Sequence, residues 1–168
     1  VFNRSELGAG TRGSSLGIDS ILIEASKRMK TFFVKNPTIN IITKNDFLFK
    51  KTKYKWAKYA SPLINIYSDI SNKISSILKE NRFPIIFSGD HGNAYGSICG
   101  LKKSFINDEI GVIWIDAHAD LHSPYTTPSG NIHGMPLAMA LNEDNLKFEI
   151  GDVDKETIKV WDKLKKID

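Results

Sequence analysis

Cysteine is nearly absent from this sequence, since Cys99 is the only one among 168 residues. A single cysteine excludes an internal disulfide framework and a cysteine-rich zinc finger, and it is typical of a reducing compartment. The chain also lacks any apolar run that approaches the roughly 20 residues needed to span a bilayer. Residues 1–17 are polar and glycine-rich, without the apolar core of a signal peptide. We therefore expect a globular, cytoplasmic protein with no membrane partner.

A strong excess of one charge is also missing, because 23 basic residues oppose 19 acidic ones and leave a net charge of +4. The lysines at 155–166 alternate with acidic residues, as on a solvated helix face. Those at 50–58 lie beside Tyr54, Trp56 and Tyr59, a pattern that also occurs in proteins that bind single strands. A surface loop and helix start explain this second group more simply. We therefore expect no nucleic-acid partner.

The apolar pattern predicts an α/β fold in one domain, residues 1–168, because no repeat or linker divides the chain. Helical spacing predicts helices at about 16–29, 62–80, 93–103 and 155–165, and another that begins near 135. Runs that are apolar on both faces, at 83–87 and 111–115, predict strands of a buried parallel sheet, and residues 1–3 fit the end of another strand.

Metal-binding residue types follow both predicted strands. The first strand ends at Asp90-His91, and the second ends at Asp-Ala-His-Ala-Asp, residues 116–120. Residues two apart in an extended chain point the same way, so Asp116, His118 and Asp120 can converge on one point. His91, from the neighbouring strand end, can complete the set. A lone Asp or His at a strand end is more often a cap, but this spacing favours a metal site.

Carboxylates mixed with imidazoles, with no thiolate nearby, suit Mn²⁺, and Co²⁺, Fe²⁺ or Zn²⁺ are alternatives. A bridging Asp would allow a two-metal site of the kind that activates water for hydrolysis. The loop at 126–134 follows and returns His133, a candidate general acid or base, toward this site. Ser129 and Asn131 in the same loop offer hydrogen-bond donors and acceptors to a polar substrate.

Three motifs in order resemble the arginase (ureohydrolase) family: Ser-Gly-Asp-His at 88–91, Asp-Ala-His-Ala-Asp at 116–120 and Ser-Gly-Asn-Ile-His-Gly at 129–134. Gly-Thr-Arg-Gly at 10–13 also looks like an arginase entry segment. The resemblance covers nearly the whole chain. It implies a three-layer α/β/α sandwich with a mostly parallel sheet, of which the C-terminal part is absent from this chain. It also implies a homo-oligomer, a trimer or hexamer, for the intact protein.

The resemblance implies hydrolysis of L-arginine to L-ornithine and urea at a site that holds two Mn²⁺ ions. It implies these roles: His91 and Asp120 as ligands of one ion, His118 as a ligand of the other, Asp116 as the bridge, His133 as the proton-transfer residue, and Ser129 as a contact to the substrate's α-carboxylate. His133 and Asp120 are the expected catalytic residues.

His122 stands where arginases commonly carry an asparagine that contacts the substrate's α-carboxylate. His122 could make that contact, or the substrate could be another guanidino or amidino compound such as agmatine, guanidinobutyrate or formimidoylglutamate. A non-catalytic module built from half a ureohydrolase is a further alternative.

The family also has a later Asp-x-Asp motif, and Asp152-Val153-Asp154 has the same letters. Because it comes too soon after His133 and leads into a lysine-rich helix, we predict that it forms a turn and an N-cap. Four of the six ligands that the resemblance implies are then present, so we expect an incomplete metal site in these 168 residues.

Overall fold

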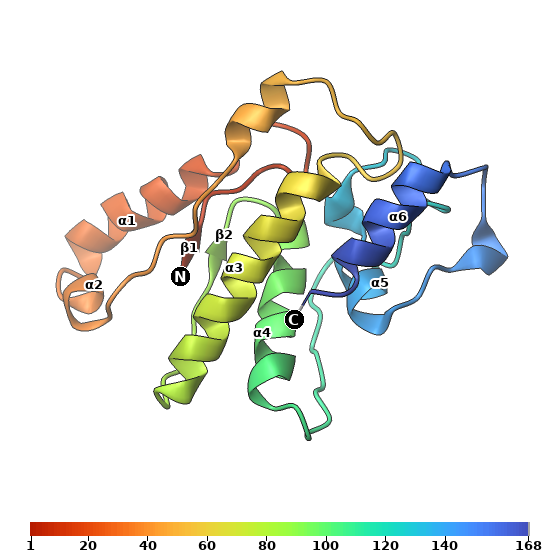
Figure 1. The fold of residues 1–168 in the computed structure, drawn as a ribbon. Helices are drawn as coiled ribbons and strands as arrows, with labels where there is room; N and C mark the ends of the chain where they lie inside the picture. Colours follow the sequence, from red (N-terminus) through yellow and green to blue (C-terminus); the bar gives the residue numbers. More distant parts are fainter. Residues whose placement is uncertain (168) are drawn as a thin grey trace.

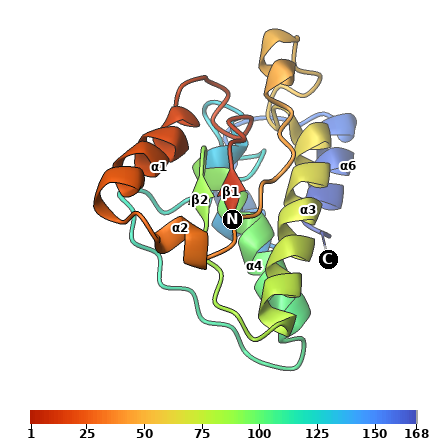
Figure 2. The same ribbon diagram turned by 90° about the vertical axis from the view of Figure 1, so that its left-hand side faces the viewer.

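A short pair of parallel strands lies between two groups of helices in the computed structural model, which describes residues 1–167 (Figure 1). Strand β1 (Phe2–Asn3) pairs with β2 (Phe87–Ser88), with Phe2 opposite Phe87 and Asn3 opposite Ser88. Helices α1 (Leu16–Arg28) and α2 (Phe32–Lys35) lie on one side of the pair, and α3 (Ala60–Lys79) and α4 (Ala94–Ser104) lie on the other (Figure 2). This layered arrangement is the α/β class that the sequence predicted.

The remaining elements are short turns and helices. They are η1 (Asn45–Phe49), η2 (His91–Asn93), η3 (Ile132–Gly134), α5 (Pro136–Leu141), η4 (Leu146–Phe148) and α6 (Lys155–Leu164). The five predicted helices are confirmed to within a few residues. Asp154 is the N-cap of α6 and accepts a hydrogen bond from Thr157 N at 2.9 Å, so the predicted turn and cap are also confirmed.

The core forms around α3, whose apolar residues recur every three or four positions and are buried. Ile70 and Ile74 pack against Gly96 and Gly100 of α4, and Ile66 and Trp161 of α6 belong to the same cluster. Gly100 permits the close approach of α4, because a Cβ at this position would lie 2.7 Å from Ser71 O. The packing of α4 on α3 thus requires a residue without a Cβ at position 100.

Gly100→Ala should lower the free energy of unfolding by about 1–3 kcal/mol, because the added methyl group forces two packed helices apart. Gly17→Ala is the matched control, since Gly17 also lies in a helix but has no atom within 4 Å of its would-be Cβ. This control should be neutral or stabilising by up to about 1 kcal/mol. Urea unfolding measures both changes, and equal effects would contradict the close-packing argument.

The predicted strand at 111–115 is wrong in this structure. Ile113 and Ile115 are 92% and 93% exposed, and within residues 1–167 no backbone–backbone hydrogen bond holds residues 110–117. The strand predicted at 83–87 is confirmed only at its end, Phe87–Ser88. An apolar run becomes a strand only where another strand lies beside it and accepts its hydrogen bonds. No described strand lies beside 111–115, so this segment stays extended and unpaired.

The loop after β1 is fixed by the buried carboxylate of Glu6. Its Oε1 accepts hydrogen bonds from Gly13 N at 2.6 Å and Ser15 N at 2.8 Å, and its Oε2 lies 2.9 Å from Arg12 Nε. These donors precede α1, so Glu6 caps a helix whose N-cap residue, Ser15, makes no side-chain capping bond. Burial raises the pKa of Glu6, but the Ser15 and Gly13 N–H groups and the Arg12 charge outweigh it, and the net pKa is lowered.

A lowered carboxyl pKa stabilises the fold above the ordinary value of 4.5, and this contribution is lost as the pH falls through the lowered pKa. Glu6→Gln should therefore cost about 1–3 kcal/mol at pH 7 and flatten the loss of stability in acid. Glu24→Gln, on the exposed face of α1, should change neither. Unfolding free energies measured from pH 7 to pH 3 test this, and parallel curves for wild type and Glu6→Gln would contradict it.

None of the helices formed by residues 1–167 combines the length and the apolar character that crossing a bilayer requires.

Candidate metal centre

The candidate site lies where β2 ends and where the extended segment 110–115 ends. After Ser88 the chain turns through Gly89, and Asp90 begins the η2 turn that carries His91. Asp116 follows the extended segment, and its Oδ1 accepts a hydrogen bond from His118 N at 2.8 Å. This bond bends the chain directly after Asp116. The two strand ends predicted to carry the chemistry therefore do lie together.

His91, Asp116 and Asp120 form one cluster, in which each offers a ligand atom within 4.8 Å of the other two. His91 Nε2 lies 2.9 Å from Asp120 Oδ2, and His91 Nδ1 lies 3.5 Å from Asp116 Oδ2. Asp120 reaches this position with a φ of 50°, in the left-handed region. Three of the four predicted ligands are thus brought together.

His118 lies outside this group. Its side chain is 83% exposed, and its Nδ1 lies 3.4 Å from Asp116 Oδ1. The expectation that Asp116, His118 and Asp120 point the same way required an extended chain, whereas the chain bends from residue 116 to 118. The local bend at Asp116 accounts for this difference between the sequence pattern and the structure.

The cluster fits a divalent cation. His91 Nε2 is buried and has no hydrogen-bond partner among the described residues, although the Asp120 carboxylate is close. A buried imidazole nitrogen beside the buried Asp120 carboxylate needs a cation or a proton between them. This donor set of one nitrogen and two oxygen ligands suits Mn²⁺ and its neighbours in the transition series. His118 N–H lowers the pKa of Asp116 by hydrogen bonding, and the His91 charge also lowers it, which keeps this carboxylate ionised.

Trp114 supports the cluster from the adjacent segment. Its Nε1 donates to Asp120 Oδ2 at 3.1 Å, and its ring contacts the His91 ring edge-on with centroids 4.7 Å apart. No motif in the sequence points to Trp114. Its position two residues before Asp116, in the segment that precedes the bend, is the signal that could have indicated it.

The cluster opens into a cleft of about 840 Å³. Its lining includes every residue proposed from the sequence for catalysis, metal binding or substrate binding: His91, Asp116, His118, Asp120, His122, Ser129, Asn131 and His133. Phe148, Ile150 and Leu121 add an apolar wall. The cleft thus joins an acidic, imidazole-rich end to apolar and hydroxyl-bearing surfaces.

The residues proposed to contact the substrate differ in their exposure and in the hydrogen bonds that they already make. His122 is exposed, with its Nδ1 3.1 Å from Thr126 Oγ1. Ser129 Oγ is also exposed and accepts a hydrogen bond from Asn131 N at 3.1 Å. Asn131 is less free, because its Nδ2 donates to Ala9 O at 3.0 Å and so ties the site loop to the loop after β1.

Burial lowers the pKa of His133 below its ordinary value of 6.5, and the histidines His91 and His118 add to this effect while Asp120 opposes it. A neutral imidazole at pH 7 can accept a proton, as a proton-transfer residue must. Gly130, three residues earlier, has a φ of 74°, and a Cβ there would lie 2.0 Å from Lys55 O. The loop that carries His133 is therefore packed on the lysine-rich segment 50–58, which gives that segment a structural role.

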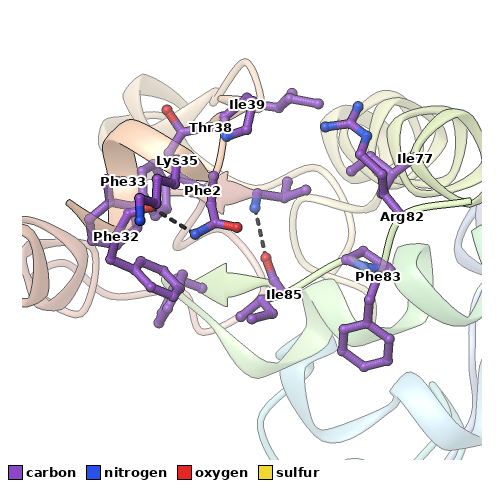
Figure 3. Close-up of a pocket in the computed structure, with 15 residues that line it drawn as sticks. Phe2, Phe32, Phe33, Lys35, Thr38, Ile39, Ile77, Arg82, Phe83 and Ile85 are labelled. Atoms are coloured by element: carbon purple, nitrogen blue, oxygen red, sulfur yellow. Dashed lines mark hydrogen bonds between the residues drawn. The ribbon is translucent and has the colours of Figure 1, made fainter. Parts of the chain in front are cut away.

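A second cavity, of about 430 Å³, lies where β1 and β2 begin (Figure 3). Aromatic side chains that include Phe2, Phe33 and Phe83 line it, together with the cations Lys35 and Arg82. Its lining contains no histidine or carboxylate, so it offers no ligand set for a divalent cation.

The model of the arginase family matches residues 4–163. The chain belongs to the arginase family. The resemblance that the motifs carried is thereby confirmed. Arginase from Brevibacillus brevis is 35% identical over 140 residues, which cover 81% of this chain and 45% of that protein.

Solved arginases share the fold. The native arginase from Bacillus caldovelox at pH 5.6 has a TM-score of 0.69 and 24% identity over 88% of this chain and 49% of its own. Arginase from Entamoeba histolytica in complex with L-ornithine has a TM-score of 0.60 and 25% identity over 88% of this chain and 50% of its own. The arginase-like α/β fold is confirmed, and the chain spans about half the length of these proteins.

Trp114→Phe should weaken Mn²⁺ binding about tenfold, because it keeps the ring against His91 but removes the N–H that orients the Asp120 carboxylate. Trp56→Phe is the control, since Trp56 stacks with Lys55 and does not line the cleft. Isothermal titration with MnCl₂ measures both affinities. An unchanged affinity for Trp114→Phe would show that Asp120 needs no such support.

Proposed function

We propose that this chain carries part of the active site of a manganese-dependent hydrolase that converts L-arginine and water to L-ornithine and urea. The observation that carries the proposal is the single cleft that holds His91, Asp116 and Asp120 together with His133, in a chain of the arginase family. The L-ornithine bound to the Entamoeba histolytica arginase supports the product class.

His91, Asp116 and Asp120 would hold the metal, with His118 as a further ligand. Bound Mn²⁺ would lower the pKa of water and so supply the nucleophile at neutral pH. The carboxylates make this end of the cleft acidic, which also attracts the cationic guanidinium group of the substrate. The apolar wall of Leu121 and Phe148 then suits the aliphatic part of the substrate.

His133 would move the proton. As a neutral imidazole in the cleft it can accept a proton when water adds to the guanidinium carbon. The C–N bond to the alkyl side breaks next, and the same proton passes to the departing amine nitrogen. Ser129, Asn131 and His122, which line the same cleft, would hold the polar head of the substrate. The close packing of Gly130 on Lys55 would support the loop that carries His133.

Asp120→Asn should weaken Mn²⁺ binding by at least about tenfold, because it removes one charged ligand from the cluster. Asp108→Asn, at an exposed position outside the cleft, is the matched control and should bind as the wild type does. Titration calorimetry on the 168-residue chain gives both values. Absence of Mn²⁺ binding by the wild type would contradict the proposed metal centre.

Urea release tests the reaction itself. Because the chain spans about half the length of its relatives, we propose that residues outside it supply the remaining ligands, and we expect little urea from the 168 residues alone. Rapid urea release by this chain would contradict an incomplete site. The cytoplasmic location and the trimer or hexamer stay predictions.

Another guanidino or amidino compound is the second candidate substrate. The exposed imidazole of His122, hydrogen-bonded to Thr126, favours it, because an imidazole offers a different contact from an amide at the substrate's polar head. Activity of the metal-loaded intact protein with agmatine or guanidinobutyrate, and not with L-arginine, would support this candidate. The non-catalytic module would be supported by two results together. The chain would be stable without Mn²⁺, and the intact protein would act on none of these substrates.

A further inference from the structure

We propose that Asp90 is a positioning residue that sets His91 and His133 relative to each other from behind the cleft. The inference deepens the proposed function and rests on it for the roles of the two histidines. Asp90 itself is 6% exposed and does not line the cleft, so it acts through other residues. Its carboxylate accepts one backbone N–H on each oxygen, from Gly92 and from Gly8.

The first hydrogen bond fixes His91. Asp90 Oδ1 accepts from Gly92 N at 2.8 Å, which closes the η2 turn around His91. The carbonyl oxygen of Asp90 accepts hydrogen bonds from Ser88 Oγ at 2.9 Å and Asn93 Nδ2 at 3.1 Å. Both ends of the turn are therefore held, which fixes the backbone from which the His91 side chain extends.

The second hydrogen bond reaches His133 through the loop after β1. Asp90 Oδ2 accepts from Gly8 N at 3.0 Å, and Gly8 O accepts from His133 N at 3.0 Å. Residues 8, 90 and 133 are far apart in the sequence, and this carboxylate connects their backbones. One side chain thus places both the metal-ligand turn and the proton-transfer turn.

Packing leaves this carboxylate no alternative position. A Cβ on Gly8 would lie 2.4 Å from Asp90 Oδ1, and a Cβ on Gly92 would lie 3.1 Å from the same atom and 3.2 Å from His133 Cα. The hydroxyl of Tyr67, close to Gly92, is buried and has no hydrogen-bond partner among the described residues. Two glycines therefore provide the space that Asp90 occupies, and loss of one acceptor leaves a buried N–H unpaired.

Asp90→Asn tests the inference, because it keeps the side-chain shape and replaces one acceptor with an N–H₂ donor. We would record the imidazole NMR signals of the metal-free chain at pH 8, at a temperature where circular dichroism shows the variant folded, and then titrate Mn²⁺. Asp90→Asn should shift the ring signals of His91 and His133, leave those of the Thr126-bonded His122 in place, and raise the Kd for Mn²⁺ about tenfold or more. Asp108→Asn should change none of these.

A role in stability alone would lower the melting temperature but leave the ring signals and the Kd of the folded variant unchanged, and that result would overturn the inference. If Asp90→Asn does not fold, Gly8→Ala perturbs the same connection from the other side. Gly8→Ala should shift the ring signals of both histidines, because its Cβ would meet Asp90 Oδ1, the acceptor of Gly92 N, and because Gly8 O accepts from His133 N. Unchanged His133 signals in folded Gly8→Ala would overturn the inference as well.

Different results would contradict the proposed metal-dependent function and the positioning role of Asp90. A wild-type chain that binds no Mn²⁺ contradicts the proposed function, while the imidazole signals of the metal-free chain still decide the role of Asp90. Mn²⁺ binding by the wild type, with an equal Kd and equal ring signals in Asp90→Asn, leaves the proposed function in place and rejects the positioning role.

Discussion

Two buried carboxylates hold the loops on which the site depends. Within residues 1–167, no strand pairs with the chain between β1 and α1, so its N–H groups need other acceptors. Glu6 supplies one acceptor to Gly13 and Ser15, and Asp90 supplies another to Gly8. Burial raises the pKa of Asp90 to about 7, although the N–H groups of Gly8, Gly92 and Asn93 lower it and the Glu6 charge raises it further. The backbone donors offset part of the cost of placing these acids inside the protein, and the site loops take their positions from them.

The helices could be predicted from the sequence because their information is local. The apolar residues of α3 recur at helical spacing, and the cap of α6 lies three residues from its donor. A strand depends on distant residues, since its backbone needs another strand alongside. The run 111–115 is apolar enough for a buried strand, yet the described residues provide no partner for it. The apolar residues of this segment could be recognised in the sequence, but whether another strand lies beside it could not.

The candidate site was predictable where residue type alone decides the chemistry. All the residues proposed from the sequence line one cleft, because each follows β2 or the unpaired segment 110–115, or lies in the loop 126–134 that is hydrogen-bonded to the loop after β1. Orientation was less predictable. His118 turns outward because its own N–H bonds to Asp116, and the Asn131 amide bonds to Ala9 O instead of remaining free. The contact of Asn131 joins residues 122 positions apart, which no local pattern contains.

The unpaired segment 110–115 leads directly into the metal cluster, so the order of the segment and the binding of a metal affect each other. Asp116 and Asp120 follow residues 110–115 directly, and His91 contacts both acids and Trp114 from the η2 turn. Two carboxylates that share a site repel each other unless a proton or a cation lies between them. A cation bound there would connect the unpaired segment to the end of β2, and any ligand that binds only the folded state stabilises it by mass action. Metal affinity and the order of residues 110–120 are therefore thermodynamically linked, and each depends on the position that Asp90 gives to His91.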